Sequence, residues 1–371
     1  MKIRIAFLIP TLGKGGAERV LLTLTRNLDT SRFEVYIFCL NKSGELLVHA
    51  EPSITICNLD CPRAYLAFFS IRKHIKQYKP HILVSWLGNL NAILSFFIPF
   101  LPTSTLYMCR ESNIPTIFNK QYRFPSVFNF LYRFMGRYQS IICQTKAMAT
   151  DLVKNFQVKE EKIHVIGNPV KISENIQQLP EKDQHFLHPG DKVLLFVGRF
   201  SQEKGLDRLL SLIKIIKDGY KLFLVGYGPY EKTIKSTIEE HKLDDRIRIV
   251  TDCNDPSAYY AKADCIVMTS YVEGMPNVLL EAFSWGCPAV VYKTLGGVQD
   301  IITNETGIYI SPGSNMDIDG LMDVIVSVCN DTETFNRAGI IQWVRQHHGT
   351  DMIVTKYMET FEFEWQRKKK K

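Results

Sequence analysis

Two carboxylates stand in an otherwise apolar stretch of the sequence, SYVEGMPNVLLEAFSWGCPAV at residues 270–290. The first is Glu273, and the only other charged residue of the stretch is Glu281. The helix expected from Asn277 is apolar on nearly every face, so it should be buried, and a buried carboxylate is costly unless it meets a hydrogen-bond donor. Ribose hydroxyls would satisfy Glu281, as would a protein cation such as Lys204 or a neighbouring loop that Glu281 caps.

The spacer between the two carboxylates, Gly274–Asn277, determines which way they face. If Pro276 takes the first helical position, where its missing N–H is harmless, Glu273 lies in the loop before the helix. Along one continuous helix the carboxylates would lie about 12 Å apart, at roughly 1.5 Å per residue. The turn instead lets Glu273 and Glu281 contact opposite ends of a single ligand.

Two of the three cations in the segment VGRFSQEKGLDRLL, residues 197–210, lie between a predicted strand and a predicted helix. Arg199 follows directly on a predicted strand, and Lys204 precedes a helix that begins near Gly205. Arginine offers a planar fork of donors and lysine a point charge, a combination suited to a diphosphate. A structural alternative pairs Arg199 with Glu203.

Two glycine-rich turns resemble dinucleotide-binding fingerprints, GKGGAE at 13–18 and GYGPYE at 226–231. Neither completes G-x-G-x-x-G, because the third glycine position holds Glu18 in one and Glu231 in the other. A hydride-transfer enzyme is therefore disfavoured. A glycine turn that opens a helix still offers backbone N–H groups to an anion, although close packing explains the second turn as well.

These residues need a scaffold, and alternating strands and helices supply it. Residues 3–10 read as a buried strand, followed by a glycine turn, an amphipathic helix and a second strand at 33–40. After a polar link at about 171–190, the pattern restarts with a strand at 192–197. Two doubly wound α/β domains are expected, and such domains bind ligands beyond the carboxyl ends of their strands. Nearly all the motifs above follow a predicted strand.

Composition and charge fit a two-domain cytosolic protein, because 371 residues are too many for one ordinary core. The nine cysteines are scattered, with no CxxC pair, which is typical of reduced thiols. Residues 1–180 hold 22 Lys+Arg against 11 Asp+Glu, a charge of +11, whereas residues 181–371 hold 23 against 27, a charge of −4. The basic half could face nucleic acid, an anionic membrane or a phosphorylated substrate.

Membrane contact has further support in the basic half. Residues 92–101, AILSFFIPFL, are nearly all apolar but about half the length that would span a bilayer. Residues 114–142 then mix aromatic side chains with basic ones such as Lys120, Arg133 and Arg137. Aromatic and basic faces suit the interface of an anionic bilayer, so peripheral membrane association is expected. A helix packed on its own domain would give a similar pattern.

Five segments together carry a resemblance to a known family: GGAER (15–19), VIGNPV (165–170), GRFSQEKG (198–205), LVGYGP (224–229) and EGMPNVLLE (273–281). In their order and spacing, from residue 3 to about 313, the chain resembles the retaining nucleotide-sugar glycosyltransferases of family four. GGAER is typical of the members that build bacterial surface polysaccharides and lipid-linked oligosaccharides. The resemblance implies a GT-B fold, in which two Rossmann-like doubly wound domains face each other across a cleft.

The resemblance also implies roles for particular residues. Arg199 and Lys204 would hold the donor diphosphate and act in catalysis with Glu273, which would contact the transferred sugar. Glu281 would bind the ribose hydroxyls. The other expected contacts are loop and backbone positions: Gly274, Met275, Pro276 and Asn277 at the sugar, Gly15 and Gly16 at the sugar or its phosphate, and Gly226, Gly228, Cys253 and Asn254 near the base.

The sequence departs from the family pattern at one place. Many members carry a histidine near the end of the fourth strand or the next one, in contact with the donor sugar, whereas this chain reads SWLGN at 85–89 and CRES at 109–112. Arg110 and Glu111 could take part of that role as substrate-binding residues. No D-x-D follows a strand, so transfer without a metal or other cofactor is expected, with Arg199 and Lys204 stabilising the leaving diphosphate.

The expected protein is therefore a retaining, metal-independent hexosyltransferase. Residues 1–178 would form an acceptor domain and 179–349 a donor-nucleotide domain, with a helix from about 350 to 371 packing back on the first. The donor would be a nucleotide-diphosphate sugar, UDP-linked by expectation, and the acceptor a lipid-linked or polysaccharide glycan, with no nucleic acid partner. The expected location is the inner face of the cytoplasmic membrane. The alternatives are a sugar-nucleotide epimerase or hydrolase of the same fold, and a catalytically inactive nucleotide-binding scaffold.

Overall fold

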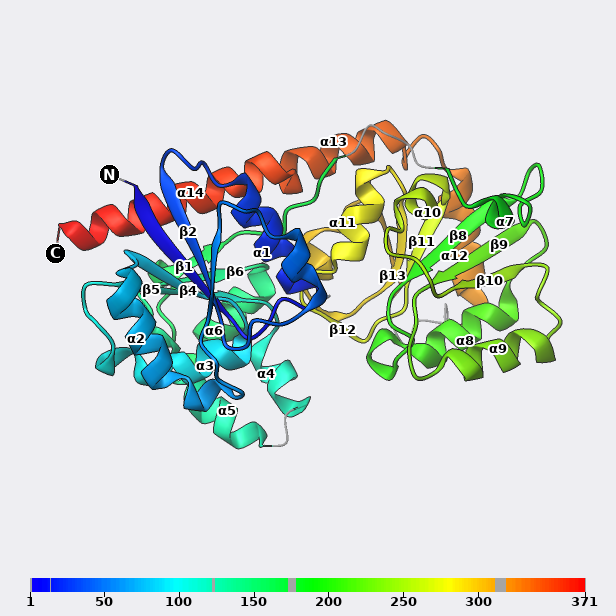
Figure 1. Cartoon of the computed structure of the whole chain (residues 1–371). Helices are drawn as coiled ribbons and strands as arrows, with labels where there is room; N and C mark the ends of the chain where they lie inside the picture. The colour runs from blue at the N-terminus through cyan, green and yellow to red at the C-terminus, as the bar shows by residue number, and fades with distance from the viewer. Residues whose placement is uncertain (1, 14, 122–123, 173–177, 311–317, 371) are drawn as a thin grey trace. The chain divides into compact units, whose positions relative to one another are not determined.

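The structure, a computed structural model, describes residues 2–370 except 14, 122–123, 173–177 and 311–317. The chain divides into two compact units (Figure 1). Unit 1 is Met1–Pro169 together with Thr350–Lys371, and unit 2 is Val170–Gly349. The division thus falls at Pro169, upstream of the expected boundary at 178, and the C-terminal residues group with unit 1.

Unit 1 is built on a parallel sheet whose strand order, among the described residues, is β3-β2-β1-β4-β5-β6-β7. The interior strand β1 pairs with β2 on one side and with β4 on the other, so the strand order reverses there, as it does at the ligand-binding point of doubly wound sheets. The strands are β1 (Ile3–Ile9), β2 (Phe33–Cys39), β3 (Thr55–Asn58), β4 (Ile82–Ser85), β5 (Leu106–Glu111), β6 (Ser140–Cys143) and β7 (Ile163–Val165).

Alternate residues of β1 belong to two different cores. Phe7 packs with α1 and α14 on one face of the sheet, whereas Leu8 packs with α2, α3 and α6 on the other. Strands buried on both faces read as continuous apolar runs, which is the pattern of residues 3–10. The helices that precede α14 in unit 1 are α1 (Gly16–Asn27), α2 (Phe68–Tyr78), α3 (Gly88–Phe97), α4 (Pro115–Phe118), α5 (Pro125–Tyr132) and α6 (Lys146–Phe156).

The last helix, α14 (Thr350–Lys369), packs on the sheet of unit 1 (Figure 1). Its buried face includes Ile353, Tyr357 and Phe361, and the Phe361 ring meets Phe7 and Phe33 edge to face. Burying each of these side chains contributes about 1.5–3 kcal/mol. The C-terminal segment is therefore an integral part of the core of unit 1.

Unit 2 repeats the doubly wound plan. Its main sheet is parallel, with the order β10-β9-β8-β11-β13-β15 among the described residues, and a second, short sheet pairs β12 with β14. The strands are β8 (Lys192–Val197), β9 (Tyr220–Val225), β10 (Ile247–Val250), β11 (Cys265–Met268), β12 (Val272–Glu273), β13 (Ala289–Tyr292), β14 (Leu295–Gly296) and β15 (Gly307–Ile310).

Helices cover both faces of the main sheet of unit 2 (Figure 1). They are α7 (Glu181–Gln184), α8 (Leu206–Ile215), α9 (Glu231–Glu240), α10 (Ser257–Lys262), α11 (Asn277–Ser284), α12 (Ile318–Asn330) and α13 (Arg337–His348). Strands β8 and β11 are central and buried, so the segments that leave their carboxyl ends start from a rigid base. Those segments carry most of the sequence-predicted site residues of unit 2.

Candidate functional site

The carboxyl edge of the unit 2 sheet gathers the loops that the sequence singled out. Because the strands are parallel, their carboxyl ends share one edge. Arg199 follows β8, the Gly226–Gly228 turn follows β9, and Cys253 and Asn254 follow β10. Beyond β11 the chain reaches β12, which ends at Glu273. The residues of unit 2 that are expected to contact the base, the phosphate and the sugar thus lie in loops at the same edge of the sheet.

Lys204 and Glu273 form an ion pair at this edge. The Lys204 Nζ donates to Glu273 Oε1 at 2.7 Å, and the side chains are 29% and 12% exposed. The backbone holds the pair as well, because Thr269 Oγ1 donates to the Lys204 carbonyl at 2.6 Å. Two of the predicted catalytic residues are therefore in direct contact, although they are 69 positions apart in the sequence.

Glu281 meets a tyrosine and not the lysine that the sequence offered as its protein cation. The Tyr260 hydroxyl, from α10, donates to Glu281 Oε2 at 2.8 Å. Lys204 forms its ion pair with Glu273 instead, so the alternative in which Lys204 is the partner of Glu281 is wrong. The helix α11 is buried as expected through Leu279, Leu280 and Phe283. It begins at Asn277, with Pro276 just outside it as the N-cap residue.

The loop that carries Glu273 is fixed by a second loop that the sequence did not single out. Strand β12 pairs in parallel with β14, with Glu273 opposite Gly296, and the Gly297 N–H donates to the Gly274 carbonyl at 2.8 Å. Gly296 has φ +139°, and a Cβ there would collide with the Glu273 carbonyl. The double glycine after β13 was the signal that could have predicted this contact, since such a backbone approach requires glycine.

The two glycines of the GYGP turn have a packing reason in the structure. A Cβ on Gly226, which has φ +151°, would collide with the Gly198 carbonyl, and one on Gly228 would collide with the Phe200 carbonyl. The Phe200 N–H in turn donates to the Tyr227 carbonyl at 3.0 Å. The turn after β9 is thus locked onto the turn after β8, which carries Arg199. Arg199 is exposed and forms no side-chain hydrogen bond or ion pair with the described residues.

In unit 1, the GGAER motif opens α1. Gly15 is the N-cap residue, Gly16 begins the helix, and both are exposed. A Cβ on Gly15 would collide with the Glu18 carboxylate. Burial raises the pKa of Glu18, with its own backbone N–H opposing the shift. Gly15 and Gly16 are exposed, but the Glu18 carboxylate lies beside Gly15 and would compete with an anion for this helix N-terminus.

Arg110 lies inside unit 1, away from solvent. Its side chain is fully buried and rests 4.5 Å from the centre of the Trp86 ring. The guanidinium donates to the Tyr357 hydroxyl at 3.0 Å, to Ser112 Oγ at 3.1 Å and to Asn168 Oδ1 at 2.5 Å. The sequence expected a sugar contact from Arg110, whereas in the structure its donors serve these protein acceptors and tie β5 to α14.

Glu111 is likewise fully buried at the end of β5. Burial raises its pKa to about 7, opposed by hydrogen bonds from Asn91, the Ser112 N–H and Tyr132. A Cβ on Gly88 would lie 2.6 Å from Glu111 Oε1, so the glycine of SWLGN makes room for this carboxylate. The segment that lacks the family histidine thus packs against an ionisable group with a near-neutral pKa.

Two family models match the chain, one in each half. Residues 14–174 match the model described as Glycosyltransferase Family 4, and residues 177–339 match Glycosyl transferases group 1. The chain belongs to glycosyltransferase family 4. All five motifs that carry the resemblance lie within these matches.

Two curated relatives of this glycosyltransferase are named for bacterial glycan synthesis. The chain is 27% identical over 294 residues to the amylovoran biosynthesis glycosyltransferase AmsD of Erwinia amylovora, covering 78% of this chain and 81% of that protein. It is 26% identical over 316 residues to a Campylobacter jejuni N-acetylgalactosaminyltransferase whose name specifies a diphospho-undecaprenol-linked acceptor, covering 81% and 84%.

Solved structures show that the fold is GT-B. Anabaena HepE in complex with UDP matches with a TM-score of 0.78 at 17% identity, over 98% of this chain and 100% of that one. The lipopolysaccharide outer core galactosyltransferase WaaB matches with a TM-score of 0.76 at 18% identity, over 97% and 99%. The expected α/β class with two Rossmann-like domains is therefore confirmed.

Proposed function

We propose that this glycosyltransferase moves a hexose from a UDP-sugar, with retention at the anomeric carbon, to a membrane-associated glycan in bacterial polysaccharide, lipopolysaccharide or lipid-linked oligosaccharide assembly. Complexes of HepE with UDP and UDP-glucose support the donor class. Relatives named for transfer to diphospho-undecaprenol-linked glycans support the acceptor class. AmsD and WaaB, named for amylovoran and lipopolysaccharide, support the pathway class.

The observation that carries the proposal is the charge arrangement at the carboxyl edge of the unit 2 sheet. Neighbouring elements there carry the exposed Arg199, the ion pair of Lys204 with Glu273, and Glu281 on the buried helix α11. In the proposal Arg199 and Lys204 hold the diphosphate, and Glu281 accepts hydrogen bonds from the ribose hydroxyls. Glu273 and the backbone of residues 274–277 contact the sugar.

The proposed reaction requires stabilisation of the negative charge that develops on the leaving group. The bond between the anomeric carbon and the diphosphate oxygen breaks, the acceptor hydroxyl forms the new bond and loses its proton, and UDP leaves with additional negative charge. Fixed cations aimed at that charge lower the barrier, and here Arg199 and Lys204 supply them with no metal or other cofactor. Because Lys204 is bound to Glu273 before the donor arrives, the diphosphate competes with Glu273 for the ammonium group.

The test is a panel of UDP- and GDP-sugars incubated with the purified protein. We expect one donor to raise the melting temperature and to be hydrolysed slowly, and EDTA to leave the hydrolysis unchanged. Failure of every nucleotide to bind would refute the proposal. Binding with neither hydrolysis nor transfer would favour the inactive scaffold, and a change in the sugar of the recovered nucleotide would favour the epimerase.

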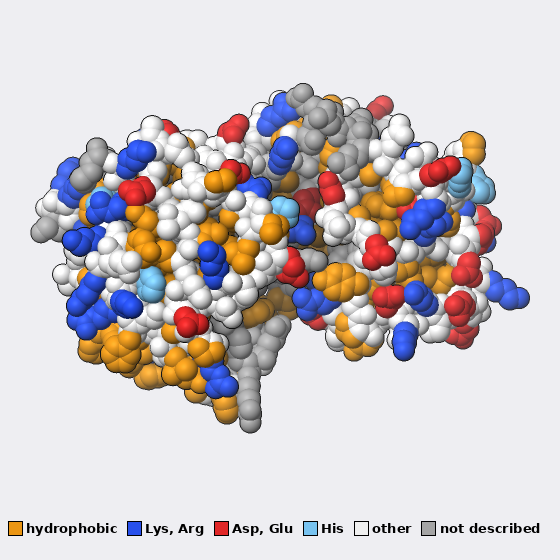
Figure 2. All heavy atoms as spheres, viewed as in Figure 1, with side chains coloured by type: hydrophobic (Ala, Val, Ile, Leu, Met, Phe, Trp, Pro, Cys, Tyr) orange, Lys and Arg blue, Asp and Glu red, His pale blue; other side chains and the backbone are white. Residues whose placement is uncertain are grey.

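We also propose that unit 1 docks on the inner face of the cytoplasmic membrane through an aromatic–basic surface. This surface is formed by α2, α3, the following segment 98–102 and the segment 125–137, and hydrophobic side chains gather there (Figure 2). Ring contacts run through it without a break, joining Phe69, Phe68, Phe97, Phe96, Phe134 and Phe130. Phe69 is 78% and Phe100 61% exposed, which is unusual for side chains of this size.

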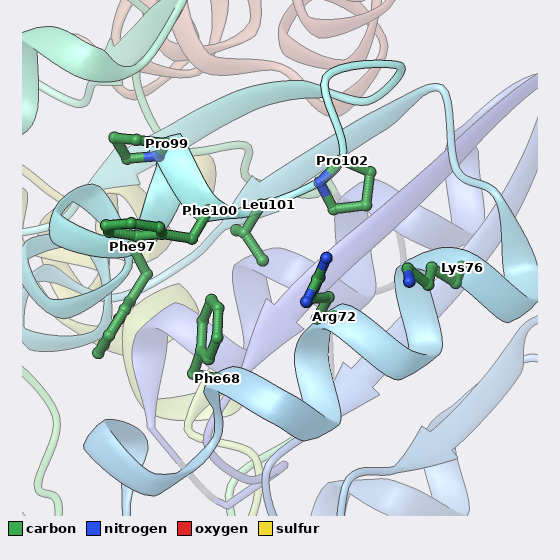
Figure 3. A pocket seen from close by; sticks show the side chains of 8 residues that line it. All are labelled: Phe68, Arg72, Lys76, Phe97, Pro99, Phe100, Leu101 and Pro102. Atoms are coloured by element: carbon green, nitrogen blue, oxygen red, sulfur yellow. The ribbon is translucent and has the colours of Figure 1, made fainter.

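Cations line an open hollow in this surface. The hollow holds about 620 Å³ and is lined by Arg72 and Lys76 from α2 and by the 97–102 segment opposite (Figure 3). Neither cation forms an ion pair with a described residue. Apolar rings beside unpaired cations match an interface of acyl chains and anionic headgroups. Among the described residues, no helix is both long and apolar enough to cross a bilayer.

Vesicle sedimentation tests this docking surface. Wild-type protein should sediment with vesicles that contain phosphatidylglycerol and much less with pure phosphatidylcholine. Arg72→Gln with Lys76→Gln, or Phe69→Ser with Phe100→Ser, should reduce the bound fraction severalfold. A charge-matched control, Lys214→Gln with Lys262→Gln on unit 2, should leave it unchanged. Equal binding by all these variants would refute the assignment of the surface.

A further inference from the structure

Arg208 occupies an unusual place beside the candidate site. It lies on α8, half-buried, with its guanidinium 4.1 Å from the centre of the Tyr271 ring and 4.4 Å from that of Tyr292. The Arg208 Nη1 donates to the carbonyls of Thr269 at 3.1 Å and Ser270 at 3.3 Å. One side chain therefore touches the segment after β11 and the end of β13.

These two segments are the ones that build the β12–β14 pair. Tyr271 immediately precedes β12, which ends at Glu273, and Tyr292 precedes β14, which places Gly296 opposite Glu273. The Arg208 guanidinium lies between the two tyrosine rings and so contacts both segments just before the β12–β14 pairing begins. Arg208 therefore contacts the residues that lead into both strands of the Glu273–Gly296 pairing.

Further contacts tie the Lys204 turn to the same place. The Tyr271 N–H donates to the Glu203 carbonyl at 3.1 Å, and the Tyr271 hydroxyl hydrogen-bonds to Asp207. Together with the bond from Thr269 to the Lys204 carbonyl, they join the residues before β12 to the start of α8. Arg208 therefore lies where three segments meet: the turn that holds Lys204, the residues before β12 and the residues before β14.

Arginine is the residue type that this geometry requires. Its planar group can stack on aromatic rings on either side while its N–H donors reach backbone carbonyls, which lysine cannot do in the same fixed geometry. Arg208 forms no ion pair with a described carboxylate, and its neighbour Asp207 is bound to Tyr271. Salt-bridge formation therefore does not account for an arginine at this position.

We propose that Arg208 is a positioning residue for Glu273 and Lys204. It does not touch the donor; it acts by holding the β12 and β14 loops, so that the carboxylate and the ammonium group keep their relative places. This inference rests on the proposed function for its activity readout, but the loop-holding role itself can be tested without turnover.

The test without turnover is hydrogen exchange. Arg208→Met keeps an unbranched apolar side chain between the rings and removes the donors. We expect amides in 269–275 and 292–297 to exchange at least tenfold faster than in wild type, with the rest of unit 2 unchanged. The matched control is Lys214→Met, which removes an exposed cation from the same helix and should leave these amides unaffected. Unchanged exchange in Arg208→Met would overturn the proposal.

The test with turnover is a double-mutant cycle, using the UDP-sugar that the panel shows to be hydrolysed. Arg208→Met should lower kcat/KM at least tenfold in wild type but less than twofold in a Glu273→Gln background, because residues that act through one another are non-additive. Arg208→Lys should behave like Arg208→Met, since charge alone does not restore the clamp. Equal losses in both backgrounds, or full rescue by lysine, would contradict a positioning role. If wild type hydrolyses no UDP-sugar, the proposed function fails, and hydrogen exchange still decides the role of Arg208.

Discussion

Replacing Glu281 by glutamine tests the proposed ribose contact at the one charged residue of α11. Glutamine keeps the shape and an oxygen to which the Tyr260 hydroxyl, now 2.8 Å from Glu281 Oε2, can still donate. The helix should therefore stay folded, and only the charge is lost. A hydrogen bond to a charged group contributes about 1.5–3 kcal/mol, and every 1.4 kcal/mol is tenfold in affinity, so UDP should bind about 10- to 100-fold more weakly.

The assay is calorimetric titration with UDP and with uridine, which shares the ribose but lacks the diphosphate. Glu281→Gln should weaken both ligands by a similar factor, because both carry the ribose. Lys204→Met should weaken UDP alone. Glu273→Gln should leave UDP affinity unchanged or improve it, since it frees Lys204 from the ion pair observed at 2.7 Å.

Tyr260→Phe is the matched control, because it removes the hydroxyl that donates to Glu281 and leaves the carboxylate in place. It should change UDP affinity far less than Glu281→Gln does. If Glu281→Gln binds UDP within about threefold of wild type while its melting temperature is unchanged, the ribose assignment is wrong. Such a result would leave Glu281 with a structural role, through its hydrogen bond with Tyr260.

Three further predictions concern residues that the structure brought forward. Burial raises the pKa of Glu111 to about 7, whereas a glutamate in an unfolded chain has a pKa of about 4.3. Between these two pH values Glu111 is protonated in the folded protein and ionised in the unfolded chain. The free energy of unfolding therefore falls as the pH rises from about 4.3 to about 7. Glu111→Gln should therefore gain melting temperature relative to wild type from pH 5 to pH 8, and a difference that does not change with pH would contradict this. Gly296→Ala should abolish donor hydrolysis by breaking the β12–β14 pair, whereas Gly339→Ala in α13, with ordinary space for a Cβ, should leave hydrolysis intact. Arg110→Met should lower stability by about 3 kcal/mol or more because it strands buried acceptors, and a loss of kcat with an unchanged melting temperature would instead support the expected sugar contact of Arg110.

The sequence by itself determined the architecture and the places where chemistry could occur. Apolar runs such as 3–10 and 192–197 predicted strands buried on both faces, and the restart after the polar link predicted a second doubly wound domain. These are local signals, because strand burial and helix periodicity are written in neighbouring residues. The short strands β3, β12, β14 and β15 carried too weak a pattern to be predicted, and β12 and β14 exist only through their mutual pairing.

Only the tertiary structure decided which groups meet. Lys204 and Glu273 are 69 positions apart, and Tyr260 and Glu281 are 21 apart, so no spacing rule could assign Lys204 to Glu273 in preference to Glu281. Arg110 looked available at a strand end, yet α14, 247 positions away, supplies Tyr357 and helps to enclose it. Nothing in the sequence singled out Arg208, whose two tyrosine partners come from separate segments of the chain. Long-range packing sets these partners, because a side chain's environment is made by segments that the fold, and not the local sequence, brings together.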